Sequence, residues 1–180
     1  CFDSGGNVYT CGNYVTIDTV RVAVRAYDGA GNLLWNGSHR TTLRAIARHP
    51  DGIVTAGASI DGANIKLFAL DGTLTWARSY LGGGTIRGVA ADSAGNVYVC
   101  GVRTGSITTA KYDSSGTLVW SADHGLTVYG IAIDSDGNVY TGGVGDSGSS
   151  NYTTRKYDSS GTLLWSLSHY PSNPTTVWGI

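Results

Sequence analysis

Residues 128–165 read VYGIAIDSDGNVYTGGVGDSGSSNYTTRKYDSSGTLLW and contain four short apolar or alternating segments. These segments are VYGIAID, NVYTGG, TTRKYD and TLLW, with DSDG between the first two and DSSG between the last two. Asp, Ser and Gly favour tight turns, whereas short runs rich in Val, Ile, Thr and Tyr favour strands. The stretch therefore predicts four antiparallel strands that follow one another in sequence order.

The same pattern occurs three more times along the chain. The repeats span residues 1–46, 47–89, 90–131 and 132–180, which gives a period in the forties. Such a period with four strands per repeat is typical of a β-propeller blade. Helical repeats would instead show a 3.6-residue periodicity, which is absent. We therefore predict an all-β fold in which residues 1–180 form one β-propeller domain of four blades, each with four antiparallel strands.

The two ends of the sequence match each other. Joining Ile180 to Cys1 gives TVWGI-CFDSGGNVYTCG, which matches TVYGI-AIDSDGNVYTGG at the junction of the third and fourth repeats. Because closure removes free sheet edges, we expect the N- and C-terminal segments to pair and close the ring. Two alternatives stay open: the chain is four repeats of a larger propeller, or several chains pair into a larger ring. The first residue is Cys rather than Met, which fits a processed or excised piece, or a missing leader.

The composition argues against several classes of function. The chain of 180 residues has a formal net charge of −1, and no run of Lys or Arg suggests nucleic-acid binding. No apolar run is long enough to span a bilayer. The chain contains no Glu, and nearly every Asp stands at a predicted turn. Since no catalytic motif is present either, we expect a protein that is not an enzyme and needs no cofactor.

The repeated motifs resemble a known family. GIAIDSDGNVYTGG followed by KYDSSGTLLW resembles the β-propeller repeat family labelled SBBP, and is similar to the pyrroloquinoline-quinone-like and NHL-like propellers. The resemblance implies the fold and says little about activity, because propellers serve many unrelated functions. The second repeat departs most, with HPDG at its first turn and DGT in place of DSSGT. We expect this blade to differ in shape at one face.

Two patterns resemble metal-binding sites, and we predict that neither binds a metal. The sequence DSDGN resembles the start of a calcium loop, but the positions that need Gly and an acid hold Val139 and Gly145. A turn stabilised by Asp explains this pattern better. A W-x-x-x-H pattern places three His at equivalent positions on outer strands, too far apart to share one zinc ion. These residues are His39, His124 and His169.

A large aromatic residue recurs once in each repeat. One interpretation is a set of sugar-binding platforms, and the other is packing between neighbouring blades, which would bury a large apolar area. Recurrence in all four repeats favours packing. The residues are Trp35, Trp76, Trp120 and Trp165.

A functional site is expected where the repeats differ in chemistry. One position near the start of the inner strand changes from repeat to repeat, and the connecting loops vary as well. Two guanidinium groups and two aromatic rings at one mouth of the ring would suit a small ligand or a glycan. The alternative is a pair of arginines at a solvated channel mouth. The four residues are Arg44, Arg87, Tyr129 and Trp178.

Two classes of function follow from this pattern. The first is a non-catalytic binding or adhesion module, such as a lectin-like or surface-attachment propeller, which belongs to a secreted, cell-surface or virion protein and recognises a glycan or a protein. The second is a structural or assembly unit without a small-molecule ligand, whose blade edges or faces pair with other copies in a homo-oligomer. Variable loops on a rigid scaffold favour the first class.

Overall fold

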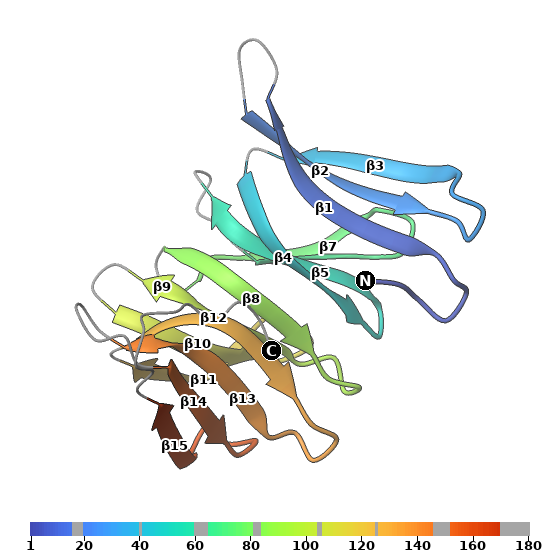
Figure 1. Ribbon diagram of the computed structural model, residues 1–180. Coiled ribbons are helices and arrows are strands. Elements are labelled where there is room, and N and C mark those ends of the chain that lie inside the picture. The colour runs from blue at the N-terminus through green and yellow to red at the C-terminus, as the bar shows by residue number, and fades with distance from the viewer. Residues whose placement is uncertain are drawn as a thin grey trace.

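The computed structural model describes residues 1–15, 20–39, 41–59, 65–80, 84–103, 106–124, 126–145 and 152–169. Within these ranges every regular element is a β-strand, and the strands form a curved row of twisted sheets (Figure 1). None of these residues forms a helix that is long and apolar enough to cross a membrane. The all-β prediction is confirmed, in agreement with a sequence rich in Gly, Thr, Val and Tyr.

The strands fall into four consecutive groups, which we call units 1 to 4. Unit 1 contains β1 (Val8–Val15), β2 (Val20–Tyr27) and β3 (Leu33–His39). Unit 2 contains β4 (Thr41–His49), β5 (Gly52–Ser59), β6 (Ile65–Phe68) and β7 (Leu74–Arg78). Unit 3 contains β8 (Thr85–Ala91), β9 (Val97–Arg103), β10 (Ser106–Tyr112) and β11 (Leu118–His124). Unit 4 contains β12 (Leu126–Ile133), β13 (Val139–Gly145), β14 (Tyr152–Tyr157) and β15 (Leu163–His169).

Within each unit the strands pair antiparallel in sequence order, as predicted. The first strands of units 2 to 4, which are β4, β8 and β12, lie side by side across the units (Figure 1). Units 2 and 3 count as one sheet of eight strands, but a single residue pair, Ala58 with Thr85, joins them. The units begin at the start of the inner strand, whereas the sequence repeats divide that strand near its middle.

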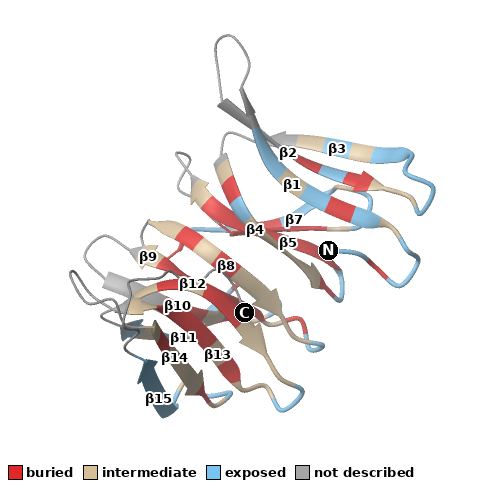
Figure 2. Cartoon of the chain, in the orientation of Figure 1, coloured by how far each residue is buried: buried red, intermediate tan, exposed pale blue. Residues whose placement is uncertain are grey.

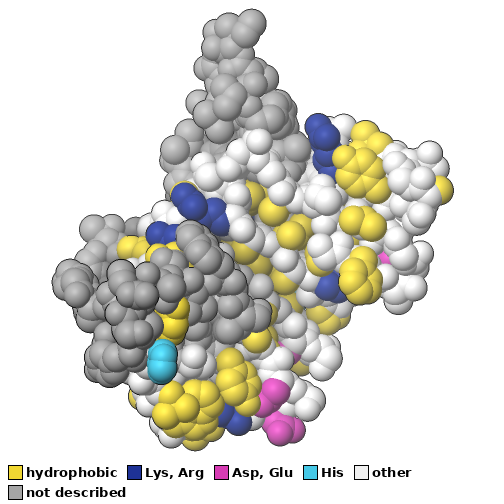
Figure 3. Space-filling view, in the orientation of Figure 1, with side chains coloured by type: hydrophobic (Ala, Val, Ile, Leu, Met, Phe, Trp, Pro, Cys, Tyr) yellow, Lys and Arg dark blue, Asp and Glu magenta, His cyan; other side chains and the backbone are white. Residues whose placement is uncertain are grey.

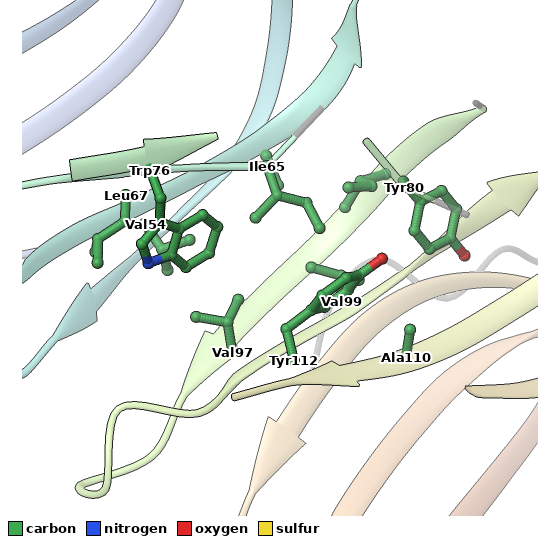
Figure 4. Packing of buried hydrophobic residues seen from close by; sticks show 11 residues of the cluster. Val54, Ile65, Leu67, Trp76, Tyr80, Val97, Val99, Ala110 and Tyr112 are labelled. Carbon is green, nitrogen blue, oxygen red and sulfur yellow. The ribbon is translucent and has the colours of Figure 1, made fainter. Parts of the chain in front are cut away.

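The hydrophobic core lies between consecutive units (Figure 2). The largest cluster joins units 2 and 3, and Figure 4 shows Trp76 of β7 beside Val97 of β9 and Tyr112 of β10. A second cluster joins units 1 and 2, and a third joins units 3 and 4. Because each sheet has one apolar face for each neighbour, burial of apolar area holds the units in a row.

The repeated tryptophans contact the next unit along the chain, which confirms packing between units for the first three. In each case the indole Nε1 donates a hydrogen bond to a backbone carbonyl in the last turn of the following unit. The donor–acceptor pairs are Trp35 with Leu70 at 2.6 Å, Trp76 with Ser114 at 3.1 Å, and Trp120 with Ser159 at 3.1 Å. A buried indole that has an acceptor for its N–H is a favourable packing element.

Unit 1 differs from the others because only three strands are described there. Its inner position holds Cys1 and Phe2, where Phe2 forms an isolated bridge with Val8 and the N-terminal ammonium donates to the Tyr9 carbonyl at 3.0 Å. Units 1 and 4 lie at opposite ends of the row (Figure 1). The C-terminal segment 170–180 lies outside the described residues, so closure of a four-bladed ring stays a prediction.

Candidate ligand site at the bulges of the inner strands

A β-bulge interrupts each inner strand at the same place. The register of β4, β8 and β12 shifts by one residue, and the extra residues are Arg44, Arg87 and Tyr129. A bulge removes its extra residue from the hydrogen-bonded ladder and redirects the side chain, and bulges are frequent next to functional sites. Three of the four predicted site residues therefore share one structural position. The fourth, Trp178, lies outside the described residues.

Glycine stands opposite each bulge because the two backbones approach closely there. A Cβ atom added at Gly57, Gly101 or Gly143 would lie between 2.0 and 2.3 Å from a carbonyl oxygen of the inner strand. Real Cβ atoms do not approach other atoms so closely, so a side chain would force the strands apart. The repeated glycine thus permits the bulge, and the bulge sets the position of the candidate site residues.

Two of the site residues contact each other across two units. The Arg87 Cζ atom lies 5.0 Å from the centroid of the Tyr129 ring, and both side chains are half-buried. This geometry is a cation–π contact, which contributes about 0.5–1 kcal/mol at an exposed site and about 2 kcal/mol when desolvated. The contact holds the Arg87 guanidinium of β8 against the Tyr129 ring of β12.

The Arg87 Nε atom is buried, and no hydrogen-bond acceptor lies within reach of it in the described part of the chain. A buried donor without a partner costs about 1–3 kcal/mol, and more when the group is charged. Unsatisfied groups of this kind are uncommon in folded proteins and often stand where a ligand, an ion or a water binds. The geometry therefore leaves one donor of a fixed guanidinium without an acceptor among the described residues.

The other guanidinium, of Arg44, is exposed on the neighbouring inner strand. Among the described residues, neither Arg44 nor Arg87 has a salt bridge with a carboxylate. Figure 3 shows Lys and Arg side chains close to where β8 begins, at the border of the grey region. This end of the units is also the end of the variable connecting loops, most of which lie outside the described residues.

The opposite end of the units carries the Asp-containing turns. In unit 4, Asp134 Oδ1 accepts from the backbone N–H groups of Asp136 and Asn138, at 3.0 and 2.8 Å. Its Oδ2 accepts from the Asn138 side chain at 2.8 Å and from the Tyr140 hydroxyl at 2.9 Å. Both carboxylate oxygens serve the turn, in agreement with a turn rather than a calcium loop. Asp3 and Asp92 have the same partners in their own turns.

These turns predict a loss of stability in acid. The hydrogen bond from the Asn138 side chain lowers the pKa of Asp134 from 3.8 to about 2, and the Asn7 side chain does the same for Asp3. A carboxyl group with a lowered pKa stabilises the fold above its usual pKa, and this contribution is lost as the pH falls towards about 2. We expect the melting temperature to fall steadily from about pH 4 to about pH 2. Calorimetry of Asp134→Asn should show a shallower dependence, and an equal slope in both proteins would contradict the assignment.

The Cys100 and His169 side chains have environments that suit neither a nucleophile nor a zinc ligand. Burial raises the pKa of the Cys100 thiol to about 12, which makes it a poor nucleophile at neutral pH. His169 stacks on Tyr152 with ring centroids 6.2 Å apart. The side chains of His39 and His124 lie outside the described residues. Within the described part of the chain, no three His, Cys, Asp or Glu side chains are grouped as metal ligands would be.

One segment of the chain matches a known protein family. Residues 122–151, from the end of β11 through β13, match the family model of SBBP, a beta-propeller repeat. This segment of the chain is therefore similar to an SBBP β-propeller repeat. The matched segment contains the inner strand with its bulge at Tyr129, the Asp134 turn and the glycine opposite the bulge. These features all lie within the matched segment, and units 2 and 3 have the same bulge and the same glycine.

Solved structures show the same fold over almost all of this chain. A crystal structure of a protein of unknown function from Bacteroides caccae is 16% identical, with a TM-score of 0.62, over 91% of this chain and 58% of that one. The WD40 domain of Neurospora crassa Pan2 is 10% identical, also with a TM-score of 0.62, over 92% of this chain and 57% of that one. This chain therefore spans less than two thirds of either structure. No curated protein matches its sequence.

Sequence reasoning located the variable position and missed its local geometry. Three features depend on strand register, which cannot be predicted from the sequence alone. They are the bulge, the contact between Arg87 and Tyr129, and the buried Arg87 Nε atom. One signal was available: glycine recurs at equivalent positions 12, 57, 101 and 143. In a strand, such a glycine often marks a bulge or a close backbone approach.

Proposed function

We propose that this chain is a non-catalytic binding module that holds a glycan bearing acidic groups beside the bulges of the inner strands. Arg87 and Tyr129 form the centre of the site, Arg44 lies at the same position of the neighbouring unit, and Trp178 extends the site in the sequence pattern. A protein ligand with acidic side chains is the second candidate for the same site.

The observation that carries the proposal is the buried Arg87 Nε atom, which has no acceptor among the described residues. A carboxylate or sulfate oxygen would accept this hydrogen bond and offset the charge at the same time. A hydrogen bond to a charged group contributes about 1.5–3 kcal/mol, roughly twice that of a neutral one. The cation–π contact with Tyr129 orients the guanidinium before the ligand arrives, which lowers the entropy lost on binding.

The absence of catalysis is also part of the proposal. A general acid needs a pKa near the working pH, and the Asp134 and Asp3 carboxyl groups have pKa values of about 2 and accept hydrogen bonds within their own turns. The Cys100 thiol stays protonated at neutral pH because burial raises its pKa to about 12. Rigid units with variable loops at one end suit recognition.

A glycan array that includes uronic-acid and sulfated oligosaccharides tests the proposal. We expect the wild-type chain to bind one or more acidic glycans, and titration calorimetry to show a loss of about 10-fold or more for Arg87→Ala. Arg87→Lys should lose most of the affinity as well, because Lys keeps the charge but lacks the planar guanidinium with its Nε–H.

Arg25→Ala is the matched control, because Arg25 is exposed on β2 and the change in net charge is the same. It should bind as the wild type does. Equal losses in Arg25→Ala and Arg87→Ala would reduce the interaction to general charge attraction. An array without any acidic glycan among its hits would contradict the proposal.

A further inference from the structure

In unit 4, the tryptophan of the outer strand β15 is exposed, whereas the equivalent tryptophan of each preceding unit packs against the next unit. Trp165 stands in β15 at the position of Trp35, Trp76 and Trp120, and it stays 37% exposed, whereas Trp76 is 9% exposed. No acceptor for its Nε1 lies within hydrogen-bond distance among the described residues. Leu167 in the same strand is 66% exposed. At the matching position in unit 3, Ala122 packs against the cluster shared with unit 4.

Together with the neighbouring strand β14, these residues form an apolar face, which we call the end face of unit 4. Trp165, Leu167, Tyr152 and His169 line a shallow hollow of about 420 Å³ on it. Figure 3 shows hydrophobic side chains gathered at this end of the molecule, and Figure 2 shows β15 exposed throughout. The strand β14 also carries Lys156. Its counterpart in unit 3, Lys111, donates to the Ser159 carbonyl of unit 4 at 3.4 Å.

Unit 1 has a surface that matches this face, at the turn that contains Gly29 and Gly31. We call it the receiving face of unit 1. In units 2 to 4 the turn glycine lies against the side chains of the preceding unit: an added Cβ would be 2.8 Å from Trp35 at Gly72 and 2.6 Å from Trp120 at Gly161. The equivalent Gly31 has the same backbone conformation, with φ of 87°, and nothing within 4 Å. The carbonyl that would accept the indole N–H belongs to Gly29, at the position of Ser114 and Ser159.

Among the described strands, β1 pairs with β2 on one side and has no inner strand on its other side. At Gly57, Gly101 and Gly143 a carbonyl of the inner strand lies against the glycine, whereas an added Cβ at Gly12 meets nothing within 4 Å. Among the described residues, only the isolated bridge of Phe2 with Val8 stands at the inner position of unit 1. The segment Thr175–Ile180, which follows β15 in the chain and lies outside the described residues, repeats the inner-strand sequence with TVWGI. After each of the Trp-bearing strands β3, β7 and β11, the next strand in the chain is the inner strand of the following unit.

We propose that the end face of unit 4 docks on unit 1 of a second copy of this chain, head to tail, and that two copies complete one ring. The two surfaces are the two halves of a contact that the chain makes three times internally. Units 1 and 4 stand at opposite ends of the row (Figure 1), so their described residues do not meet within one copy. A heterologous contact of this kind gives a closed ring when the rotation completes a circle.

Three proteins test the proposal by light scattering after size-exclusion chromatography: the wild type, Gly12→Val and Trp165→Ala. The wild type should have twice the mass of one chain, and both variants should have the mass of one chain. Gly12→Val has open space for its side chain, so circular dichroism should show that the chain still folds. Its side chain would collide with an incoming inner strand, as at the three equivalent glycines. Trp165→Ala removes the indole from an exposed site.

Mixing the two variants tests the direction of the contact. The Gly12→Val chain keeps an intact end face of unit 4, and the Trp165→Ala chain keeps an intact receiving face of unit 1. These two surfaces can still form one contact between unlike chains. The mixture should form a heterodimer even though neither variant forms a homodimer. A wild type that stays monomeric at high concentration would overturn the proposal, and so would variants that dimerise as the wild type does. A dimeric wild type whose variants give no heterodimer on mixing would overturn the head-to-tail arrangement.

Discussion

Replacing Trp76 with alanine should destabilise the chain by about 3–5 kcal/mol, the range for truncating a large buried aromatic side chain. Trp76 comes from β7 of unit 2 and packs in the cluster shared with unit 3 (Figure 4). Its indole N–H donates to the Ser114 carbonyl at 3.1 Å, and the Arg78 guanidinium lies 5.8 Å from its ring. The substitution leaves a cavity between two units and an unpaired carbonyl, so the loss exceeds that of the apolar area alone.

Urea denaturation of the wild type and of Trp76→Ala measures this difference. Leu74→Ala is the matched control, because Leu74 stands in the same strand and is 49% exposed. It should change the free energy of unfolding by less than about 0.5 kcal/mol. If Trp76→Ala cost no more than Leu74→Ala, the indole would not hold the units together.

Replacing Gly101 with alanine should disturb the fold and the candidate site together. The added Cβ would lie 2.3 Å from the Thr85 carbonyl oxygen and 2.7 Å from the Ile86 Cα atom, so β8 and β9 have to move apart. Overpacking of this kind costs about 1–3 kcal/mol, and the contact with backbone rather than a flexible side chain favours the upper end. The same movement shifts the bulge at Arg87, so ligand affinity should fall although Gly101 is buried behind the site.

Gly12→Ala is the control, since its Cβ meets nothing within 4 Å. The free energy of unfolding of the monomer should fall by about 2 kcal/mol or more for Gly101→Ala and stay near the wild-type value for Gly12→Ala. Thermal denaturation at a concentration that keeps each protein monomeric gives the comparison. Equal stabilities would show that the strands adapt to a side chain opposite the bulge.

The parts of the fold that depend on local sequence could be predicted. Asp134 and its equivalents mark turns because the carboxylate bonds to residues two and four positions later. Trp120 marks the outer strand because it recurs at one place in every repeat. The site prediction was partly local as well, since Arg87 and Tyr129 differ between repeats at one position. The structure brings these two together, while Arg44 contributes from the neighbouring strand.

The remaining features depend on contacts between distant residues. His49 shows this well: the sequence HPDG indicated only that the second repeat differs in shape. In the structure the imidazole is fully buried, accepts from the Asp51 N–H at 3.1 Å and lies 2.9 Å from the Gly95 carbonyl oxygen of unit 3. It thereby links two units, at a position where the other repeats have an Asp. Neither the partner of His49 nor the bulge at Arg87 can be read without the register and the packing of the units.

The single residue pair that joins units 2 and 3, Ala58 with Thr85, bears on the evolution of ring size. Backbone hydrogen bonds hold each unit together but hardly fix the angle between one unit and the next. That angle depends instead on the volume of the side chains wedged between the sheets, such as Trp76 and Tyr112. A few substitutions at these wedges would open or tighten the curvature while leaving every unit intact. Duplication of one repeat can thus yield rings with different numbers of blades without redesigning the blade.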